Sequence, residues 1–141
     1  MTTWITVCET CKTPDWQPGE SGLTSGEALA ALIEAAAAPH PTLATRRHAC
    51  LMACETPCAL VLQSSGKMGY ALAGFAPDAA MAEAVVAYAL HHAQSGSGVV
   101  QWALWPEAVK GRFQARLPPL PGDGPEAAPS GDGLTAAPSD Q

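Results

Sequence analysis

Five cysteines are the residues of this sequence whose type and spacing could do chemistry. They form two groups, Cys8-x2-Cys11 and Cys50-x3-Cys54-x3-Cys58. An odd number of cysteines does not suit a closed disulfide framework. Four thiolates brought together repel one another unless a cation or cluster compensates their charge. The spacing therefore predicts a metal centre.

Two metal centres suit four thiolates. Zinc takes four cysteines tetrahedrally, and Cys-x2-Cys is a common half-site for it. A 2Fe–2S cluster also takes four cysteines, two on each iron. Spacing alone does not choose between them, although the second pair, Cys50-x3-Cys54, departs from the usual zinc half-site and favours iron.

Two interpretations without a metal stand beside these. Buried cysteines commonly act only as small hydrophobic residues. Alternatively, Cys8 and Cys11 form a redox-active dithiol, because Cys-x-x-Cys beside a strand–helix unit is typical of thioredoxins. That motif normally opens a helix, whereas here Pro14 and Pro18 follow before a helix can begin.

The elements expected around the cysteines bring the two groups together. Residues 4–7 predict a strand that ends at Cys8. Thr24 and Glu27 match a capping box, which predicts a helix that stops before Pro39. A second strand is expected over residues 42–49. A strand–helix–strand unit is parallel with a right-handed crossover, so Cys8 and Cys50 are expected at the same edge of the sheet, where such sheets usually build their sites.

The second half of the chain predicts a hairpin and a helix. Residues 59–63 and 68–72 read as strands joined by a turn at residues 64–67. Asp78 is expected to cap a helix that carries Met81, Val85, Tyr88 and His92 in one stripe and ends near Gly96. The predicted fold class is therefore α/β, with a small mixed sheet and flanking helices.

Composition bounds the domain and excludes several classes. The chain has 141 residues, enough for one small domain. Residues 117–141 hold six prolines, four glycines and four acids with no base, which predicts a disordered tail behind a domain at 1–116. A net charge of -6 argues against nucleic-acid binding. We see no apolar run long enough to cross a membrane and no secretory signal, so a cytoplasmic location is expected. No catalytic constellation is visible, and an enzyme is not expected.

Several motifs carry a resemblance to known families. Cys50-Leu51-x-x-Cys54, followed by Pro57, an apolar strand and Gly66-Lys67-x-x-Tyr70, resembles the second half of thioredoxin-like 2Fe–2S ferredoxins. The segment 4–119 is more similar still to an uncharacterised bacterial family described as predicted metal-binding proteins. That family shares an early Val-Cys-x-x-Cys and a closing Arg-x-x-Ala-Arg-x-Pro-Pro, here residues 112–119.

The resemblance implies a thioredoxin-like fold and a 2Fe–2S protein for one-electron transfer or redox sensing, with a link to cobalamin synthesis. Cys50 and Cys54 match the two ferredoxin ligands of this loop. In those ferredoxins the second ligand lies about ten or more residues after the first, whereas here Cys11 follows Cys8 by three. A zinc protein without redox activity, in which the metal stabilises an interaction module, remains the alternative.

The ligand set expected from the sequence is Cys8, Cys11, Cys50 and Cys54, two from each strand end. Cys58 is held in reserve, because it follows Pro57 and opens a strand, where the pleat fixes its direction. We therefore expect Cys58→Ala to keep the metal and Cys54→Ala to lose it.

The remaining polar residues have simpler interpretations. His48, two residues before Cys50, is expected on the surface, and His40 in a loop. His91 and His92 are expected to complement the dipole of the second helix as cations. Trp16 is expected to cover the rim of the core. The partner is an unknown redox protein, with a homodimer left open. The cations that could dock an acidic partner are Arg46, Arg47, Lys110, Arg112 and Arg116.

Overall fold

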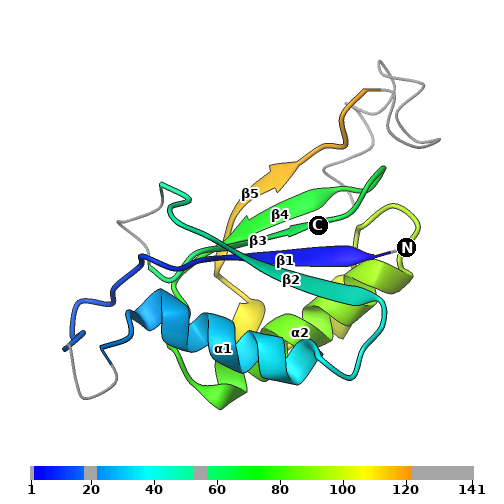
Figure 1. The fold of residues 1–141 in the computed structure, drawn as a ribbon. Helices are drawn as coiled ribbons and strands as arrows, with labels where there is room; N and C mark the ends of the chain where they lie inside the picture. Colours follow the sequence, from blue (N-terminus) through cyan, green and yellow to red (C-terminus); the bar gives the residue numbers. More distant parts are fainter. Residues whose placement is uncertain (1, 18–21, 53–56, 122–141) are drawn as a thin grey trace.

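A computed structural model describes residues 2–17, 22–52 and 57–121. It forms a five-stranded sheet in the order β2-β1-β3-β4-β5, and both helices pack on one face of that sheet (Figure 1). The elements are β1 (Thr3–Cys8), α1 (Ser25–Ala37), β2 (Leu43–His48), β3 (Leu60–Gln63), β4 (Gly69–Leu72), α2 (Ala79–Gln94), the short 3-10 helices η1 (Trp102–Leu104) and η2 (Glu107–Val109), and β5 (Phe113–Leu117). Cys54 and the tail from residue 122 onward lie outside the described residues.

The register of the sheet confirms the central part of the sequence prediction. β1 and β2 are parallel, with Thr3 opposite Leu43 and Cys8 opposite His48. β3 and β4 form the expected antiparallel hairpin, and β3 also pairs antiparallel with β1. The fold is therefore a small mixed α/β fold, and the carboxyl ends of β1 and β2 lie at one edge.

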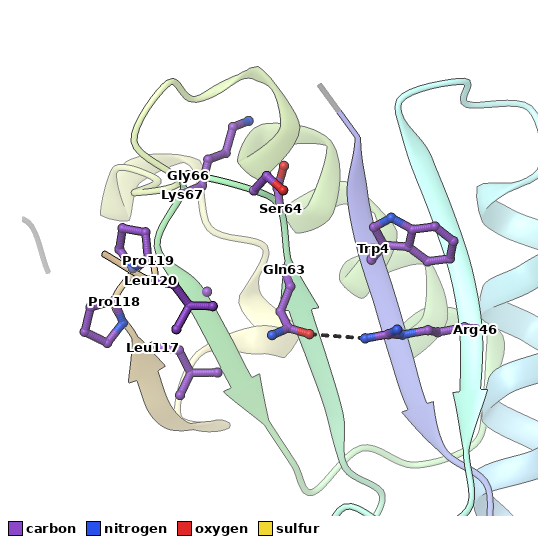
Figure 2. A pocket seen from close by; sticks show the side chains of 12 residues that line it. Trp4, Arg46, Gln63, Ser64, Gly66, Lys67, Leu117, Pro118, Pro119 and Leu120 are labelled. Atoms are coloured by element: carbon purple, nitrogen blue, oxygen red, sulfur yellow. Dashed lines mark hydrogen bonds between the residues drawn. The ribbon is translucent and has the colours of Figure 1, made fainter. Parts of the chain in front are cut away.

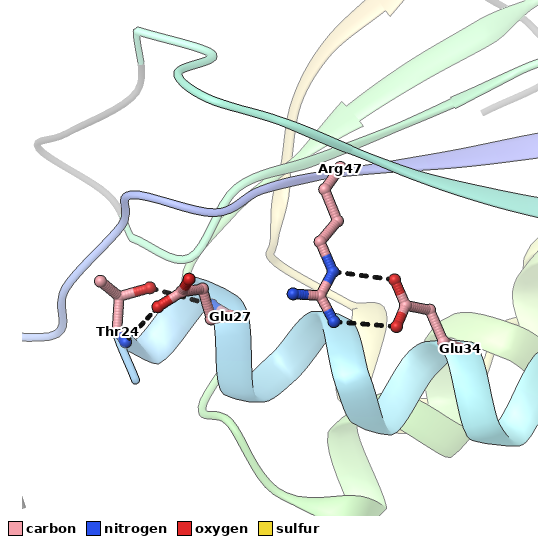
Figure 3. Close-up of polar contacts among 4 residues, drawn as sticks. All are labelled: Thr24, Glu27, Glu34 and Arg47. Carbon is pink, nitrogen blue, oxygen red and sulfur yellow. Dashed lines mark hydrogen bonds and ion pairs between the residues drawn. The ribbon is translucent and has the colours of Figure 1, made fainter. Parts of the chain in front are cut away.

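Both helices begin where their capping residues predict. The Thr24 hydroxyl accepts the Glu27 N–H at 3.0 Å, and the Glu27 carboxylate accepts the Thr24 N–H at 2.9 Å (Figure 3). Asp78 caps α2 by accepting the Met81 N–H at 2.9 Å. In the part of the chain that the structure describes, no helix is long and apolar enough to cross a membrane.

The core lies between the helices and the face of the sheet that they cover. Alternate strand residues point into it, because successive side chains of a strand face opposite ways. The fully buried members of the two central strands and the helices include Ile5, Val7, Leu60, Leu62, Leu29, Ile33, Val85 and Tyr88. At one side of this core, Arg47 on β2 forms a bidentate ion pair with Glu34 on α1, and both N···O distances are 2.9 Å (Figure 3).

Strand β5 is an element that the sequence prediction did not include. It pairs antiparallel with β4 through a register shift near Leu72, and it runs to Leu117, one residue into the segment expected to be tail. Its position depends on aromatic packing, since Phe113 contacts Tyr70, Tyr88 and Trp105 at centroid distances of 5.5, 5.3 and 4.6 Å. A short edge strand with charged residues has no clear hydrophobic pattern in the sequence. β5 could therefore be identified only from these tertiary contacts.

The expectation that His92 complements the dipole of α2 as a cation was wrong. Its side chain is fully buried. Nε2 lies 2.7 Å from the Met68 carbonyl, which can only accept, so Nε2 carries the proton and Nδ1 accepts from the Thr3 hydroxyl at 2.8 Å. Burial lowers the pKa of His92, which keeps the ring neutral. The cation at the end of α2 is instead Lys67, whose Nζ donates to the carbonyls of His92 and Ala93.

The burial of His92 predicts a pH dependence of stability. Its folded pKa lies below the ordinary value of 6.5, so the unfolded chain binds the proton more readily, and the free energy of unfolding should fall as the pH drops below 6.5. The slope contributed by one such group is at most about 1.4 kcal/mol per pH unit. Urea unfolding between about pH 7.5 and about pH 5.5 measures it.

His92→Gln should be less stable at neutral pH but should lose less stability over the same pH interval. His91→Gln is the matched control, because His91 lies half-buried one residue earlier in α2. An unchanged slope in His92→Gln would contradict the assignment.

Candidate functional site

The loop that carries Cys8 and Cys11 is fastened to the first turn of α1. The Gly26 N–H donates to the Cys11 carbonyl at 2.9 Å, and the Thr13 N–H donates to the Ser25 hydroxyl at 3.0 Å. The Thr24 hydroxyl donates to the Glu9 carbonyl. Because both partners of each bond are fixed by the sheet or the helix, the loop after β1 has little freedom.

Gly26 makes this arrangement sterically possible. A Cβ at this position would lie 2.0 Å from the Cys8 carbonyl oxygen, a separation that no side chain tolerates. The helix therefore approaches the backbone of β1 directly, and its first turn lies against the loop that carries the two cysteines.

Three cysteine side chains are buried at this edge of the sheet: Cys8 (1% exposed), Cys11 (5%) and Cys58 (0%). The Cys8 and Cys11 thiols are hydrogen-bonded to each other. The antiparallel pairing of β1 with β3 extends one residue further, because the Cys8 N–H donates to the Ala59 carbonyl at 3.0 Å. That pairing brings Cys58 within electrostatic reach of Cys8 and Cys11.

The three thiols differ in acidity. Burial raises the pKa of Cys11 to about 12, and the hydrogen bond and charge of Cys8 add to that effect. Burial also raises the pKa of Cys58 to about 11. Burial opposes ionisation of Cys8 as well, but hydrogen bonds from the Cys11 thiol, the Leu51 N–H and Thr10 outweigh it, so the pKa of Cys8 is lowered. Negative charge at this site therefore localises on Cys8.

Cys50 lies on the surface rather than among the buried thiols. Its N–H donates to His48 Nδ1 at 3.3 Å, and its sulfur accepts the Met52 N–H at 3.3 Å. The same loop reaches the buried thiols through its backbone, since the Leu51 N–H is hydrogen-bonded to Cys8. His48 is exposed, as expected.

The donor set fits a thiolate-bound metal or cluster. Three cysteine side chains lie within electrostatic reach of one another. The N–H groups of Leu51 and Ala59 stabilise charge on Cys8 and Cys11, as outer hydrogen bonds do in metal–thiolate sites. Within residues 2–17, 22–52 and 57–121, no three or more His, Cys, Asp or Glu side chains are already grouped to hold an ion. A complete set of four thiolates requires a cysteine from the loop after β2, where Cys50 is exposed and Cys54 lies outside the described residues.

Sequence reasoning did not single out Gly26, because a close approach of backbones leaves no local signal. Cys58 was held in reserve as a ligand. Pairing the strand at residues 59–63 with the first strand as well as with its hairpin partner would have placed Cys58 beside Cys8.

The other expected features lie away from the thiols. Trp16 is half-buried, and its indole N–H donates to the Leu23 carbonyl at 2.8 Å while Lys12 lies over the ring. Among the proposed docking cations, Lys110 pairs with Glu107 at 2.9 Å. Arg112 donates to the carbonyls of Ala108 and Gly74 and lies over the Phe75 ring, so its charge has a structural role.

One comparison with known proteins found a match. A model of the family described as "Protein of unknown function (DUF1636)" covers residues 5–119. This agrees with the expected resemblance to an uncharacterised family, and its description mentions no metal. Neither the curated proteins nor the solved structures contain a match to the chain.

The contact of α1 with β1 predicts the effect of a single methyl group. Gly26→Ala should destabilise the protein by about 1–3 kcal/mol, because the new Cβ would clash with the Cys8 carbonyl and push the loop from the helix. Gly96→Ala is the matched control, since nothing lies within 4 Å of a Cβ there, and its effect should stay within about 0.5 kcal/mol. Chemical unfolding measures both, and equal effects of the two substitutions would contradict the close approach.

Proposed function

The chain belongs to the DUF1636 family of proteins of unknown function, and we propose that it is a thioredoxin-like protein that binds a 2Fe–2S cluster and transfers single electrons or senses redox state. The observation that carries this proposal is the packing of three buried cysteine side chains at one sheet edge, beside the N-terminus of α1. Buried thiolates that lie close to one another need a positive charge to compensate their repulsion and their burial.

The strand topology supports the thioredoxin-like part of the proposal. A parallel β1–α1–β2 unit is followed by the antiparallel hairpin β3–β4 and then α2, and both helices cover the same face (Figure 1). A minimal thioredoxin-like sheet would have this strand order, and β5 would be an added edge strand. The site follows β1, at the carboxyl end of the parallel pair, where such sheets usually bind ligands.

We assign Cys8, Cys11 and Cys58 as three ligands, with the fourth supplied by Cys50 or Cys54. When bound, the cluster would accept and release one electron. The protein's own residues would hold it: pairing of β1 with β3 fixes the backbones of Cys8 and Ala59, next to Cys58, and the first turn of α1 holds the loop that carries Cys11. The N–H groups of Leu51 and Ala59 stabilise thiolate charge. The set expected from the sequence, with Cys50 and Cys54 and without Cys58, is the competing assignment.

A zinc protein without redox activity is the second candidate. The spacing of Cys8 and Cys11 suits it, because Cys-x2-Cys is a common half-site for a single zinc ion. In that case the metal would hold the loops after β1 and β2 against α1, and the protein would act by binding a partner.

The metal content separates the two candidates. Full-length protein purified without oxygen should be coloured and contain equal amounts of iron and acid-labile sulfide, two of each per chain. Reduction with dithionite should bleach the colour and produce a one-electron paramagnetic signal. A colourless protein with one zinc and no sulfide would remove the iron–sulfur proposal and favour the second candidate.

The ligand assignment predicts a second set of results. Cys8→Ala, Cys11→Ala and Cys58→Ala should each lose the metal, whereas one of Cys50→Ala and Cys54→Ala should keep it. If Cys58→Ala keeps the metal while both loop variants lose it, the set expected from the sequence is correct. Each variant is also compared with wild type after metal removal, by circular dichroism and chemical unfolding, so that loss of metal is distinguished from loss of fold.

A further inference from the structure

A groove lies on the face of the sheet that the helices leave open, away from the buried thiols (Figure 2). Its volume is about 270 Å³. Trp4 and Arg46, from β1 and β2, line one side, and the segment from Leu117 to Leu120 lines the other. Trp4 is 43% exposed, Leu117 38% and Leu120 70%, so that a large part of this apolar surface contacts water.

The floor of the groove is open because residue 69 is a glycine. Gly69 on β4 lies between Gln63 on β3 and Leu117 on β5. A Cβ there would lie 3.5 Å from the Leu117 Cβ and 3.6 Å from the Gln63 Cγ. Even a methyl group would therefore fill the floor.

Arg46 brings a positioned positive charge to this groove. Its Nε donates to the Thr6 hydroxyl at 2.7 Å and its Nη2 to the Gln63 amide oxygen at 3.4 Å, so the guanidinium reaches across β1 (Figure 2). It also lies 5.7 Å from the centre of the Trp4 ring.

No carboxylate of the described residues lies within ion-pair distance of Arg46. By contrast, Arg47, the next residue, is neutralised by Glu34 on the opposite face of the sheet. The groove therefore combines an uncompensated cation with apolar walls.

We propose that this groove binds a small planar carboxylate with a single aromatic ring. The guanidinium fork matches the two oxygens of a carboxylate. The Trp4 ring and the apolar segment from Leu117 to Leu120 provide surfaces on which a flat ring loses water. The groove does not involve the cysteines, so this proposal does not depend on the proposed metal centre.

The test uses full-length protein labelled with ¹⁵N and titrated with benzoate, benzamide and acetate. Benzoate should cause saturable shifts of the Trp4 indole N–H and of the Gly66 and Gly69 amides. Benzamide lacks the charge and acetate lacks the ring, so both should bind at least about tenfold more weakly. Equal binding of benzamide, or shifts that do not saturate, would overturn the proposal.

Two substitutions on neighbouring residues form the matched control. Arg46→Gln should weaken benzoate binding at least about tenfold, because it removes the charge and one arm of the fork. Arg47→Gln should leave the affinity unchanged, since Arg47 faces α1. Equal losses in both variants would mean that only the overall charge matters and would overturn the site.

The same spectra test other occupants. A synthetic peptide of residues 122–132, which carries three acids and no base, should bind more weakly than benzoate. Tighter binding of the peptide at the same amides would assign the groove to the C-terminal segment of this chain instead. Shifts of these amides on dilution without ligand would assign it to a second copy of the chain. Either outcome overturns the small-molecule proposal.

Discussion

The geometry of the cysteine site depends on the close approach of α1 to the backbone of β1. Gly26 lies so near the Cys8 carbonyl that a Cβ at residue 26 would be 2.0 Å from its oxygen. This approach allows the first turn of α1 to bond the loop at three backbone positions, Glu9, Cys11 and Thr13. A loop held in this way presents its two sulfurs in one orientation, and that lowers the conformational entropy that a bound metal would otherwise have to overcome.

The three buried cysteines at this edge differ in the pKa of their thiols. Burial raises the pKa of Cys11 and Cys58, whereas hydrogen bonds from its neighbours lower the pKa of Cys8. Burial therefore opposes ionisation of Cys11 and Cys58, and several thiolates at this edge would require a cation among them. This physical need, rather than any one spacing in the sequence, is the main argument for a metal centre.

The two faces of the sheet have separate roles. The residues on the face toward the helices contribute to stability. Lys67 donates to two carbonyls at the C-terminal end of α2, and Tyr70 packs on Tyr88 and His92. Arg112 donates to the carbonyls of Ala108 and Gly74. The open face carries Arg46 without a carboxylate among its described neighbours, and a groove with a glycine floor. A charge that contributes to no internal pair is available for a ligand, and this is why we place recognition on the open face.

The sequence by itself determined the local elements and their order. The capping residues and turns predicted both helix starts and the hairpin, because these signals depend on residues within one turn of each other. The parallel pairing of β1 with β2 followed from the handedness of strand–helix–strand units, and it placed Cys8 and Cys50 at one edge. Tertiary structure alone decided the contacts between distant segments. The pairing of β1 with β3 buried Cys58 beside Cys8, and aromatic packing created β5. Burial made His92 a neutral core residue, hydrogen-bonded to Thr3 and Met68. None of these has a local pattern, because each depends on two surfaces that meet only after the sheet has formed.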